Sequence, residues 1–376
     1  MRLKVGSFDE MAQDIKINKR EIVLFGAGVI GSTIVPSLLV RYNLAKNVRC
    51  FIDNDRSKWN QTIMILDKDV SIFPVNYLEM LGDNVVILVN ISRYSEAVKQ
   101  LDSLKCTEKM ICYIIPMMCI DNFKRKDNLY ENESGILKSK LMIIPKVIHY
   151  IWFGRKPIPD NLQRCIESWK KYCPDYEIVQ WNEDNYDISK CKYMKQAYED
   201  GKYSFATDYA KLDILYQNGG IYLDTDVELL KNIDELLYQE AFCSVEKWQV
   251  INFGGCSGSV KGHSTIKAFL EGWEKREYYR EDGTPDPISS GIVDTQVALD
   301  IGYEINGKAQ NIKGMNIYPY DYFHPYDYMS GKVHITKNTY SIHHFNGGWL
   351  DEKTKKDNEK NAEVYDKLYM RAKESL

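Results

Sequence analysis

The sequence predicts an α/β protein of two domains. A length of 376 residues with an ordinary globular composition makes about two domains the prior expectation. Apolar strands alternate with helical segments twice, first within residues 1–120 and again from residue 142 onward. Residues 121–141 between them are polar and charged, so we expect a linker there. The second domain is expected to run through residue 376 and to end in a helix.

Composition and charge exclude several classes of protein. The net charge is −4 and the sequence has no basic stripe, so we expect no nucleic-acid partner. The nine cysteines show neither a CxxC pair nor a zinc-ligand spacing, which is typical of reduced thiols. The N-terminus lacks the apolar core of a signal peptide, and no later run approaches the ~20 apolar residues that span a bilayer. We therefore expect a cytoplasmic protein with at most peripheral contact with the inner face of the membrane.

The first domain is predicted from a strand, a glycine turn and a helix. The apolar run 21–25 (EIVLF) leads directly into a glycine motif, and a helical stretch then continues through residue 39. The motif consists of Gly26, Gly28 and Gly31. Such glycines permit a tight turn and bring backbone N–H groups at the start of the helix close to a phosphate.

An acidic residue and two further strands complete the pattern of a Rossmann-like domain. The run 48–52 ends at Asp53, about where an acidic residue binds a ribose hydroxyl in a dinucleotide fold, and the run 85–89 adds a third parallel strand. The candidate ligand is a nucleotide or NAD, and the candidate residues are Gly26, Gly28, Gly31 and Asp53. The segment FIDND followed by Lys58 also resembles small sugar-nucleotide or cofactor-binding modules of polysaccharide-biosynthesis proteins. A purely structural role is the alternative.

The second domain begins with a strand, a helix and another strand. The strand 147–153 (VIHYIWF) ends in an aromatic residue and Gly154, an arrangement that can expose Trp152 for stacking on a flat base. A core position for Trp152 is the alternative. Helical spacing over residues 161–171 and a strand over 176–181 follow, as in an α/β unit.

The stretch GGIYLDTDVELL, residues 219–230, holds the main candidate for a metal site. It follows a predicted helix over 205–218, which ends at the two glycines as helices often do. Side chains alternate along a strand, so Asp224 and Asp226 point to the same side. Hard carboxylate oxygens suit Mg²⁺ or Mn²⁺, which are commonly held by one or two carboxylates and the phosphates of a substrate. A solvated turn is the alternative for the Asp-x-Asp tripeptide alone.

Two other features of the second domain bear on this site. Asp208 and Lys211 lie three residues apart on the predicted helix, and an exposed ion pair is their default interpretation. Residues 250–258 and 289–296 form polar, glycine-containing loops suited to line an acceptor pocket. Asp294 in the later loop is a candidate residue there, and an aspartate at the start of a helix is the alternative.

Three segments of the second domain resemble the DXD-containing sugar transferases of glycosyltransferase family 32, a group related to the catalytic domains of the large clostridial glucosylating toxins. The segments are VIHYIWFG, SFATDYAKLDILYQNGGIYLDTDV and SIHHFNGGW, and the likeness covers about residues 143–349. The resemblance implies a GT-A fold, a nucleotide-sugar donor and a Mn²⁺ or Mg²⁺ ion. It also implies transfer with retention of the anomeric configuration.

The resemblance implies roles for individual residues. By this likeness the donor-binding residues are Trp152, Asp208, Asp224 and Trp349, the catalytic residues are Asp208, Lys211 and Asp226, and the metal ligands are Asp224, Asp226 and His344. Trp152 would stack on the donor base, and Asp226 would be the firmest metal ligand. Relatives usually carry Arg where this chain has Lys211, and many carry Ser where it has Gly348, so donor contacts differ from the family pattern at these positions.

The sequence thus predicts a metal-dependent retaining glycosyltransferase. We expect it to move a sugar from a nucleoside-diphosphate sugar to a glycan or lipid-linked oligosaccharide in capsular or other surface polysaccharide synthesis. The expected donor is a UDP-sugar. The metal and Lys211 would offset the charge that builds on the leaving diphosphate. One alternative is an NAD-dependent sugar-nucleotide oxidoreductase that works through the first domain. Another is a non-catalytic glycan-binding protein.

Overall fold

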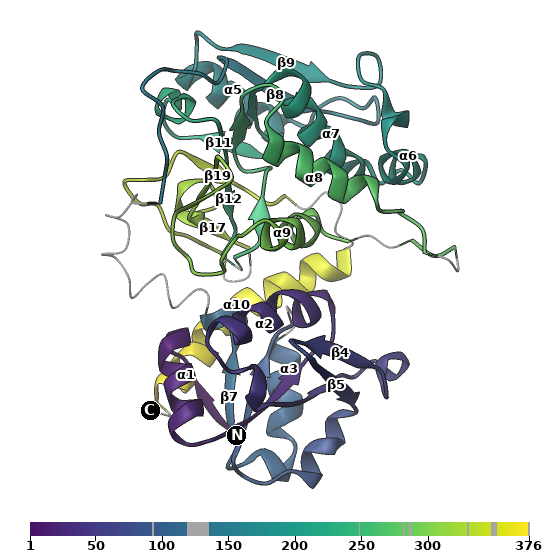
Figure 1. Cartoon of the computed structure of the whole chain (residues 1–376), viewed down its shortest axis with the longest axis vertical. Coiled ribbons are helices and arrows are strands. Elements are labelled where there is room, and N and C mark those ends of the chain that lie inside the picture. Colours follow the sequence, from purple (N-terminus) through teal and green to yellow (C-terminus); the bar gives the residue numbers. More distant parts are fainter. Residues whose placement is uncertain are drawn as a thin grey trace. The chain divides into compact units, whose positions relative to one another are not determined.

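The chain folds into two compact units, shown in Figure 1. The computed structural model describes residues 1–91, 94–118, 135–247, 249–280, 283–285, 288–328, 331–346 and 352–374. The first unit contains the described residues up to 118 and the C-terminal helix, and the second is built mainly from residues 135–346. Each unit combines helices with a sheet that contains parallel strands, which confirms the predicted α/β fold class.

The first unit has a seven-stranded sheet of order β1-β7-β6-β2-β3-β5-β4. Neighbouring strands are parallel except for β4 and β5. The strands are β1 (Arg2–Lys4), β2 (Glu21–Phe25), β3 (Val48–Ile52), β4 (Thr62–Ile65), β5 (Lys68–Phe73), β6 (Val85–Val89) and β7 (Ile111–Ile114). The helices of this part are α1 (Phe8–Ile17), α2 (Val29–Arg41) and α3 (Tyr94–Asp102). The predicted strands at 21–25, 48–52 and 85–89 are β2, β3 and β6, and their side chains are almost all buried, as in a parallel sheet covered on both faces.

The C-terminal helix α10 (Glu352–Glu374) belongs to the first unit. It contacts β1 and α3, with Tyr365 and Ala372 buried, and Arg371 donates to the carboxylate of Asp102 at 2.7 Å. This pairing lowers the pKa of the Asp102 carboxyl. The structure thus corrects the expectation that the helix closes the second domain. The sequence shows an apolar side of α10 but does not show which sheet that side covers.

The second unit is built on an eight-stranded sheet in which β10 and β8 lie side by side. Its order is β15-β16-β12-β14-β10-β8-β9, with β13 paired to β12. The strands are β8 (Val147–Ile151), β9 (Glu177–Trp181), β10 (Gly220–Tyr222), β12 (Ala241–Val245), β13 (Ile251–Asn252), β14 (Ser257–Ser259), β15 (Gln310–Ile312) and β16 (Met315–Tyr318). The helices are α5 (Asp160–Tyr172), α6 (Lys192–Glu199), α7 (Tyr203–Asn218), α8 (Ser264–Glu274) and α9 (Ser290–Asp300). Strands β9, β8 and β10 run parallel, so their carboxyl ends meet at one edge of the sheet.

Two small sheets lie outside the main sheet of the second unit. They pair β11 (Val227–Leu229) with β19 (Ser341–His343), and β17 (Tyr326–Asp327) with β18 (Lys332–Val333). The strands of the first pair are antiparallel. Of the two, β11 follows β10 in the chain after a single turn, and β19 comes from the late segment. This pair therefore places the late segment of the unit beside the carboxyl end of β10.

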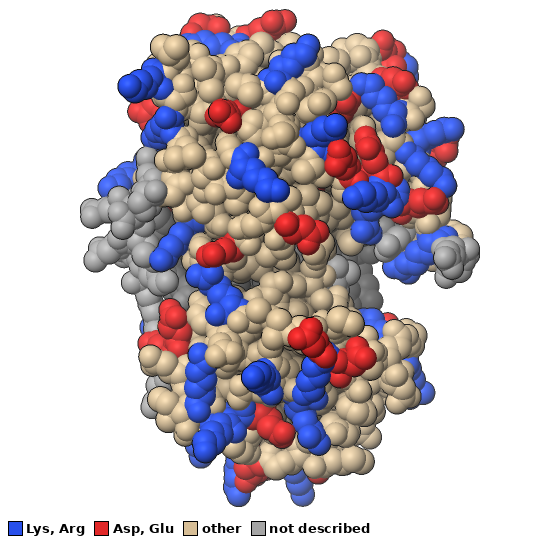
Figure 2. Space-filling view, viewed as in Figure 1, with Lys and Arg blue, Asp and Glu red and all other residues tan. Residues whose placement is uncertain are grey.

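The surface shown in Figure 2 is not dominated by charge of one sign. Acidic and basic side chains are interspersed over that face, in line with the small net charge of −4. None of the described helices is both long enough and apolar enough to cross a membrane.

The two glycines between α7 and β10 are required by the backbone and by a buried histidine. Gly219 ends α7 with a φ of 71°, and Gly220 has a φ of 93°. The ring of His149 lies directly against them, because its Nε2–H donates to the Gly219 carbonyl at 3.0 Å while its Nδ1 accepts from Trp181 at 3.1 Å. Burial lowers the pKa of His149 to about 4, so the ring is neutral at pH 7. A Cβ atom at Gly220 would lie only 2.9 Å from the Val147 carbonyl oxygen and 3.0 Å from His149 Nε2.

We predict that Gly220→Ala lowers the free energy of unfolding by about 2–4 kcal/mol, because it adds a clash to a left-handed backbone. The matched control is Gly201→Ala, where φ is 71° but no atom lies within 4 Å of the added Cβ. That variant isolates the backbone strain and should cost about 1 kcal/mol. Urea unfolding of both variants measures the difference, and equal losses would contradict the close approach at Gly220.

Candidate functional site

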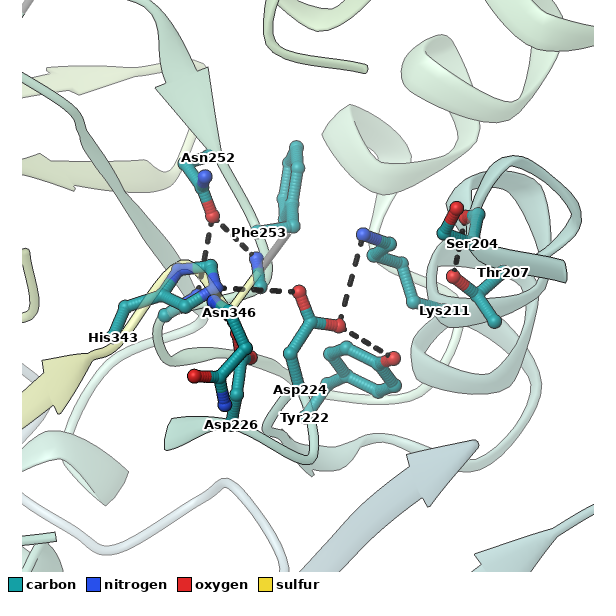
Figure 3. A network of polar contacts seen from close by, with 12 residues as sticks. Ser204, Thr207, Lys211, Tyr222, Asp224, Asp226, Asn252, Phe253, His343 and Asn346 are labelled. Carbon is teal, nitrogen blue, oxygen red and sulfur yellow. Dashed lines mark hydrogen bonds and ion pairs between the residues drawn. The ribbon is translucent and has the colours of Figure 1, made fainter. Parts of the chain in front are cut away.

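The candidate site lies at the carboxyl end of β10, where two acids and a histidine converge. Asp224 follows β10 and Asp226 precedes β11, and the pairing of β11 with β19 sets His343 opposite Val227. His343 Nε2 lies 3.2 Å from Asp226 Oδ1 and 3.9 Å from Asp224 Oδ2. One ligand atom from each of these three side chains lies within 4.8 Å of the others. Figure 3 shows the three side chains turned toward one another.

The donor set of this cluster fits a divalent ion. Two carboxylates and one imidazole nitrogen leave room for substrate oxygens to complete the coordination. Carboxylate oxygens suit Mg²⁺ and Mn²⁺, whereas imidazole is a better ligand for transition metals. The combination is therefore suited to a divalent ion such as Mn²⁺ or Mg²⁺.

Asp224 is held by contacts from three elements. Its Oδ1 accepts from the Tyr222 hydroxyl at 2.9 Å and lies 3.9 Å from the ammonium of Lys211, and its backbone N–H donates to the Gly254 carbonyl at 2.9 Å. A Cβ at Gly254 would lie 2.0 Å from Asp224 Oδ2, so only glycine permits this approach. The side chain of Asn252 accepts from the Gly254 N–H at 2.7 Å and fixes that loop. Figure 3 shows the contacts of the Asp224 carboxylate with Tyr222 and Lys211.

Asp226 is held from both sides by the segment after β19. His343 contacts its Oδ1, while the backbone N–H of Asn346 donates to its Oδ2 at 2.9 Å. The turn between them is possible because Phe345 has a left-handed φ of 48°, and its ring stacks on His343 with centroids 4.1 Å apart. Burial opposes the charged form of Asp226, but His343 and the Asn346 N–H together lower the pKa of its carboxyl to about 2. Burial alone would lower the pKa of His343, whereas the neighbouring carboxylate of Asp226 raises it above the usual value.

A buried ion pair on α7 flanks the two acids. Lys211 Nζ lies 3.0 Å from Asp208 Oδ1, and the two residues are 5% and 8% exposed. The exposed ion pair that the sequence favoured by default is therefore wrong. Burial disfavours the charge on Lys211, but Asp224 and Asp208 raise the pKa of its ammonium, so it stays protonated. The site thus holds a fixed positive charge beside the candidate metal ligands.

Asp294 lies within electrostatic range of this ion pair and is part of a helix rather than of a loop. It sits inside α9, is 3% exposed, and accepts from the Trp273 indole at 2.9 Å. Burial, and then the charge of Asp208, raise the pKa of its carboxyl to about 8. Asp294 is therefore neutral at pH 7, and the helix-start alternative is wrong because Ser289 is the N-cap of α9.

The other residues predicted for this site lie in different surroundings. Trp152 follows β8 at the same sheet edge as Asp224, and its half-buried indole donates to the Lys156 carbonyl at 2.6 Å. His344 points away from the acids and lies 3.0 Å from the carboxylate of Glu228. The structure therefore brings His343, not His344, to the acidic pair. Trp349, together with Gly348, lies outside the described residues.

The glycine motif of the first unit also comes together with its predicted acid. Gly26 and Gly28 lie in the turn between β2 and α2, Gly31 lies in the first turn of α2, and Asp53 follows β3. The carboxylate of Asp53 accepts from the Ala27 N–H at 2.7 Å. Because the acid bonds to the turn itself, its role differs from the one the motif predicted.

Comparison with known proteins finds a family match within the second unit. Residues 159–243 match the model described as "Glycosyltransferase sugar-binding region containing DXD motif". This match confirms the predicted resemblance to the DXD sugar transferases of family 32. It includes Asp208, Lys211, Asp224 and Asp226 and ends before Asp294 and His343. Residues 159–243 of the second unit are therefore similar to the sugar-binding region of DXD glycosyltransferases.

Individual relatives are similar over part of their length. The chain is 29% identical over 155 residues to inositol phosphoceramide mannosyltransferase 3 of Schizosaccharomyces pombe, covering 39% of this chain and 42% of that protein. It is 28% identical over 129 residues to mannosyl phosphorylinositol ceramide synthase SUR1 of Saccharomyces cerevisiae, covering 33% and 34%. It is 31% identical over 102 residues to the uncharacterized glycosyltransferase L373 of Acanthamoeba polyphaga mimivirus, covering 25% and 40%. The chain thus spans less than half the length of these relatives.

One solved structure is also similar, the PaToxG glycosyltransferase. It is 19% identical in sequence, and the alignment covers 50% of this chain and 77% of that chain with a TM-score of 0.35.

We predict that His343→Ala weakens Mn²⁺ binding at least about tenfold, because it removes a ligand and one contact to Asp226. His344→Ala is the matched control, since it alters the adjacent imidazole and should leave the affinity within about twofold. Mn²⁺ titration followed by electron paramagnetic resonance measures both affinities. The reverse pattern would show that the assignment of His344 by family resemblance is correct.

We predict that Asp294→Asn stabilises the protein near pH 8 and has little effect near pH 4. The pKa of the folded carboxyl is raised above its unfolded value, so its favourable contribution is complete below the unfolded pKa and is lost as pH rises toward about 8. The asparagine keeps an acceptor for the Trp273 indole but carries no proton to lose. Thermal unfolding of both proteins from pH 4 to pH 8 should show a Tm difference that grows with pH. A constant difference would mean that Asp294 titrates normally.

Proposed function

We propose that this protein transfers a sugar from a nucleoside-diphosphate sugar to a hydroxyl acceptor with the help of a divalent metal ion. The observation that supports this most is the convergence of Asp224, Asp226 and His343 next to the buried Lys211. Lys211 and the two aspartates lie in the segment that matches the DXD sugar-binding region. A diphosphate needs positive charge from two directions, and this site offers a metal position on one side and an ammonium on the other.

The acidic and basic residues of the site have different roles in this proposal. A bound metal ion would neutralise part of the charge on the diphosphate. Asp224, Asp226 and His343 would hold that ion. Lys211 places its ammonium where charge develops on the leaving phosphate, and Asp208 holds Lys211 in position from 3.0 Å. Trp152, at the same edge of the sheet, provides an aromatic surface for the donor base.

The chemistry of the reaction follows the family pattern in this proposal. The described residues around the acids include no second free carboxylate pair, since Asp208 is paired with Lys211 and Asp294 is neutral. Transfer with retention, in which the departing phosphate accepts the proton of the acceptor hydroxyl, is consistent with that arrangement.

We propose two chemical classes of donor and acceptor for this protein. The named relatives from yeasts are mannosyltransferases of inositol phosphoceramide, so a nucleoside-diphosphate mannose and an inositol-containing glycolipid are one donor and acceptor pair to test. UDP-sugars with a glycan or lipid-linked oligosaccharide acceptor of surface polysaccharide synthesis are the other. Arginine in place of Lys211 would offer two parallel donors, so the single ammonium here points to a different fit of the donor sugar.

We predict that the purified protein releases nucleoside diphosphate from at least one nucleotide-sugar with Mn²⁺ and that EDTA abolishes this activity. Asp226→Asn should lower the rate about 10²–10³-fold, as expected when a group that stabilises transition-state charge is removed. Glu228→Gln is the control, because this half-buried acid on β11 contacts His344 and not the cluster. Activity that persists in both EDTA and Asp226→Asn would exclude the metal mechanism.

A further inference from the structure

The first unit contains a second polar site, at the carboxyl ends of β2 and β6. The sheet order places β3 and β5 on one side of β2, and β6 and β7 on the other. Helices that follow neighbouring strands in such a sheet leave on opposite faces, which opens a crevice where the order reverses. The glycine turn 26–31 and Asn90 stand at this point, because they follow β2 and β6 directly. Neither residue group takes part in the sugar-transfer site.

The start of α2 is open for an anion. The N-cap of this 13-residue helix is Gly28, which gives no side-chain cap to the first backbone N–H groups. Such N–H groups and the helix dipole favour a negative charge at this end. Gly31, in the first turn of α2, must be glycine, since a Cβ there would lie 2.1 Å from the Gly26 carbonyl oxygen.

Asn90 is an independent sign of a ligand at the same place. It is 2% exposed, and neither the nitrogen nor the oxygen of its amide has a hydrogen-bond partner among the described residues. The amide faces the glycine turn, because a Cβ at Gly26 would lie 2.6 Å from its Oδ1 and a Cβ at Gly31 would lie 2.9 Å from its Nδ2. A buried amide with both atoms unpaired is unfavourable, so its presence calls for a partner that the free chain lacks.

Asp53 is not available for the ribose contact that the motif predicted. Its Oδ2 accepts from the Ala27 N–H at 2.7 Å and lies 3.3 Å from the ammonium of Lys58, while its Oδ1 accepts from the Asp55 N–H at 2.8 Å. The carboxylate thus fastens the glycine turn to the end of β3 and is neutralised by Lys58. A dinucleotide held through its ribose diol would need an acid that is free to accept those hydroxyls.

The aromatic side chain of Trp59 lies next to Asp53. The indole of Trp59 is half-buried, and its N–H donates to the Asp53 carbonyl at 2.8 Å, which fixes the ring to the end of β3. The guanidinium of Arg56 lies over this ring at 5.7 Å from the centroid, so the opposite face is the one offered to a base. Asp53 thus links Trp59 to the glycine turn, where the open helix start and the Asn90 amide lie.

We propose that the first unit binds a nucleoside diphosphate, with its phosphates at the start of α2 and the Asn90 amide and its base on Trp59. Asp53 holds the turn and does not bind the ribose, so NAD is not the ligand. The inference goes beyond sugar transfer, since it requires neither the metal site nor a glycosyl acceptor.

The test is calorimetric titration of the full-length protein in EDTA with UDP, ADP, NAD and inorganic phosphate, for the original chain and for Asn90→Leu. The leucine has nearly the same shape but no polar atoms, so it should weaken nucleoside diphosphate binding at least tenfold. It should also raise the Tm of the free protein, because an unpaired amide is replaced by an apolar group.

Asn84→Leu is the matched control, because Asn84 precedes the same strand at its opposite end and its amide donates to the carbonyls of Asn18 and Lys19. That variant should lower the Tm and leave the affinity unchanged. Binding that is lost in Asp226→Ala but kept in Asn90→Leu would belong to the second unit and would overturn the inference. A lower Tm for Asn90→Leu, equal affinity for inorganic phosphate, or tighter binding of NAD that depends on Asp53 would also overturn it.

Discussion

The buried ammonium of Lys211 is the charge on which the candidate site of the second unit depends. Lys211 lies 3.0 Å from Asp208 and 3.9 Å from Asp224, so one cation on α7 links two acids from different elements. Taking such charges out of water is costly, and removal of the lysine would leave two carboxylates uncompensated in a buried place. Lys211 on α7 can reach Asp224 after β10 because the helix and the strand are joined by almost no connecting chain. Gly219 and Gly220 provide that junction, because their positive φ angles reverse the chain within two residues.

The second half of the site comes from residues more than a hundred positions later in the chain. The register of β11 and β19 sets His343 opposite Val227, and the left-handed Phe345 turns the following backbone so that the Asn346 N–H reaches Asp226. A non-glycine residue in this conformation is unfavourable unless its surroundings compensate for the strain. The stacking of Phe345 on His343 is such a compensation, and it also fixes the imidazole that faces the acids.

Sequence alone was sufficient for the local features and insufficient for those that depend on distant contacts. Strands β2, β3, β6 and β8 and the end of α7 at two glycines follow from periodicity and turn chemistry. Asp224 and Asp226 converge as predicted, but they lie in the turn between β10 and β11, so the reason is not the alternation of side chains along a strand. His343 and His344 are adjacent in the sequence, and only the pairing of β19 with β11 decides which of them faces the acids. The burial of Asp294, the neighbours of α10 and the bonding of Asp53 likewise depend on packing between segments far apart. In the sequence, the only signal for His343 was the histidine pair itself.

Both units carry a polar cluster at the carboxyl ends of parallel strands, yet the two clusters are built for opposite charges. In the second unit Asp224 and Asp226 converge with one cation nearby, so negative charge remains and favours a metal ion. In the first unit the acid is already matched by two backbone N–H groups and Lys58, while the start of α2 is left without a side-chain cap. Positive potential therefore remains there and favours a phosphate. The corresponding edges of the two sheets attract different ligands, because the balance of charges at each edge, rather than the fold, decides which ligand binds.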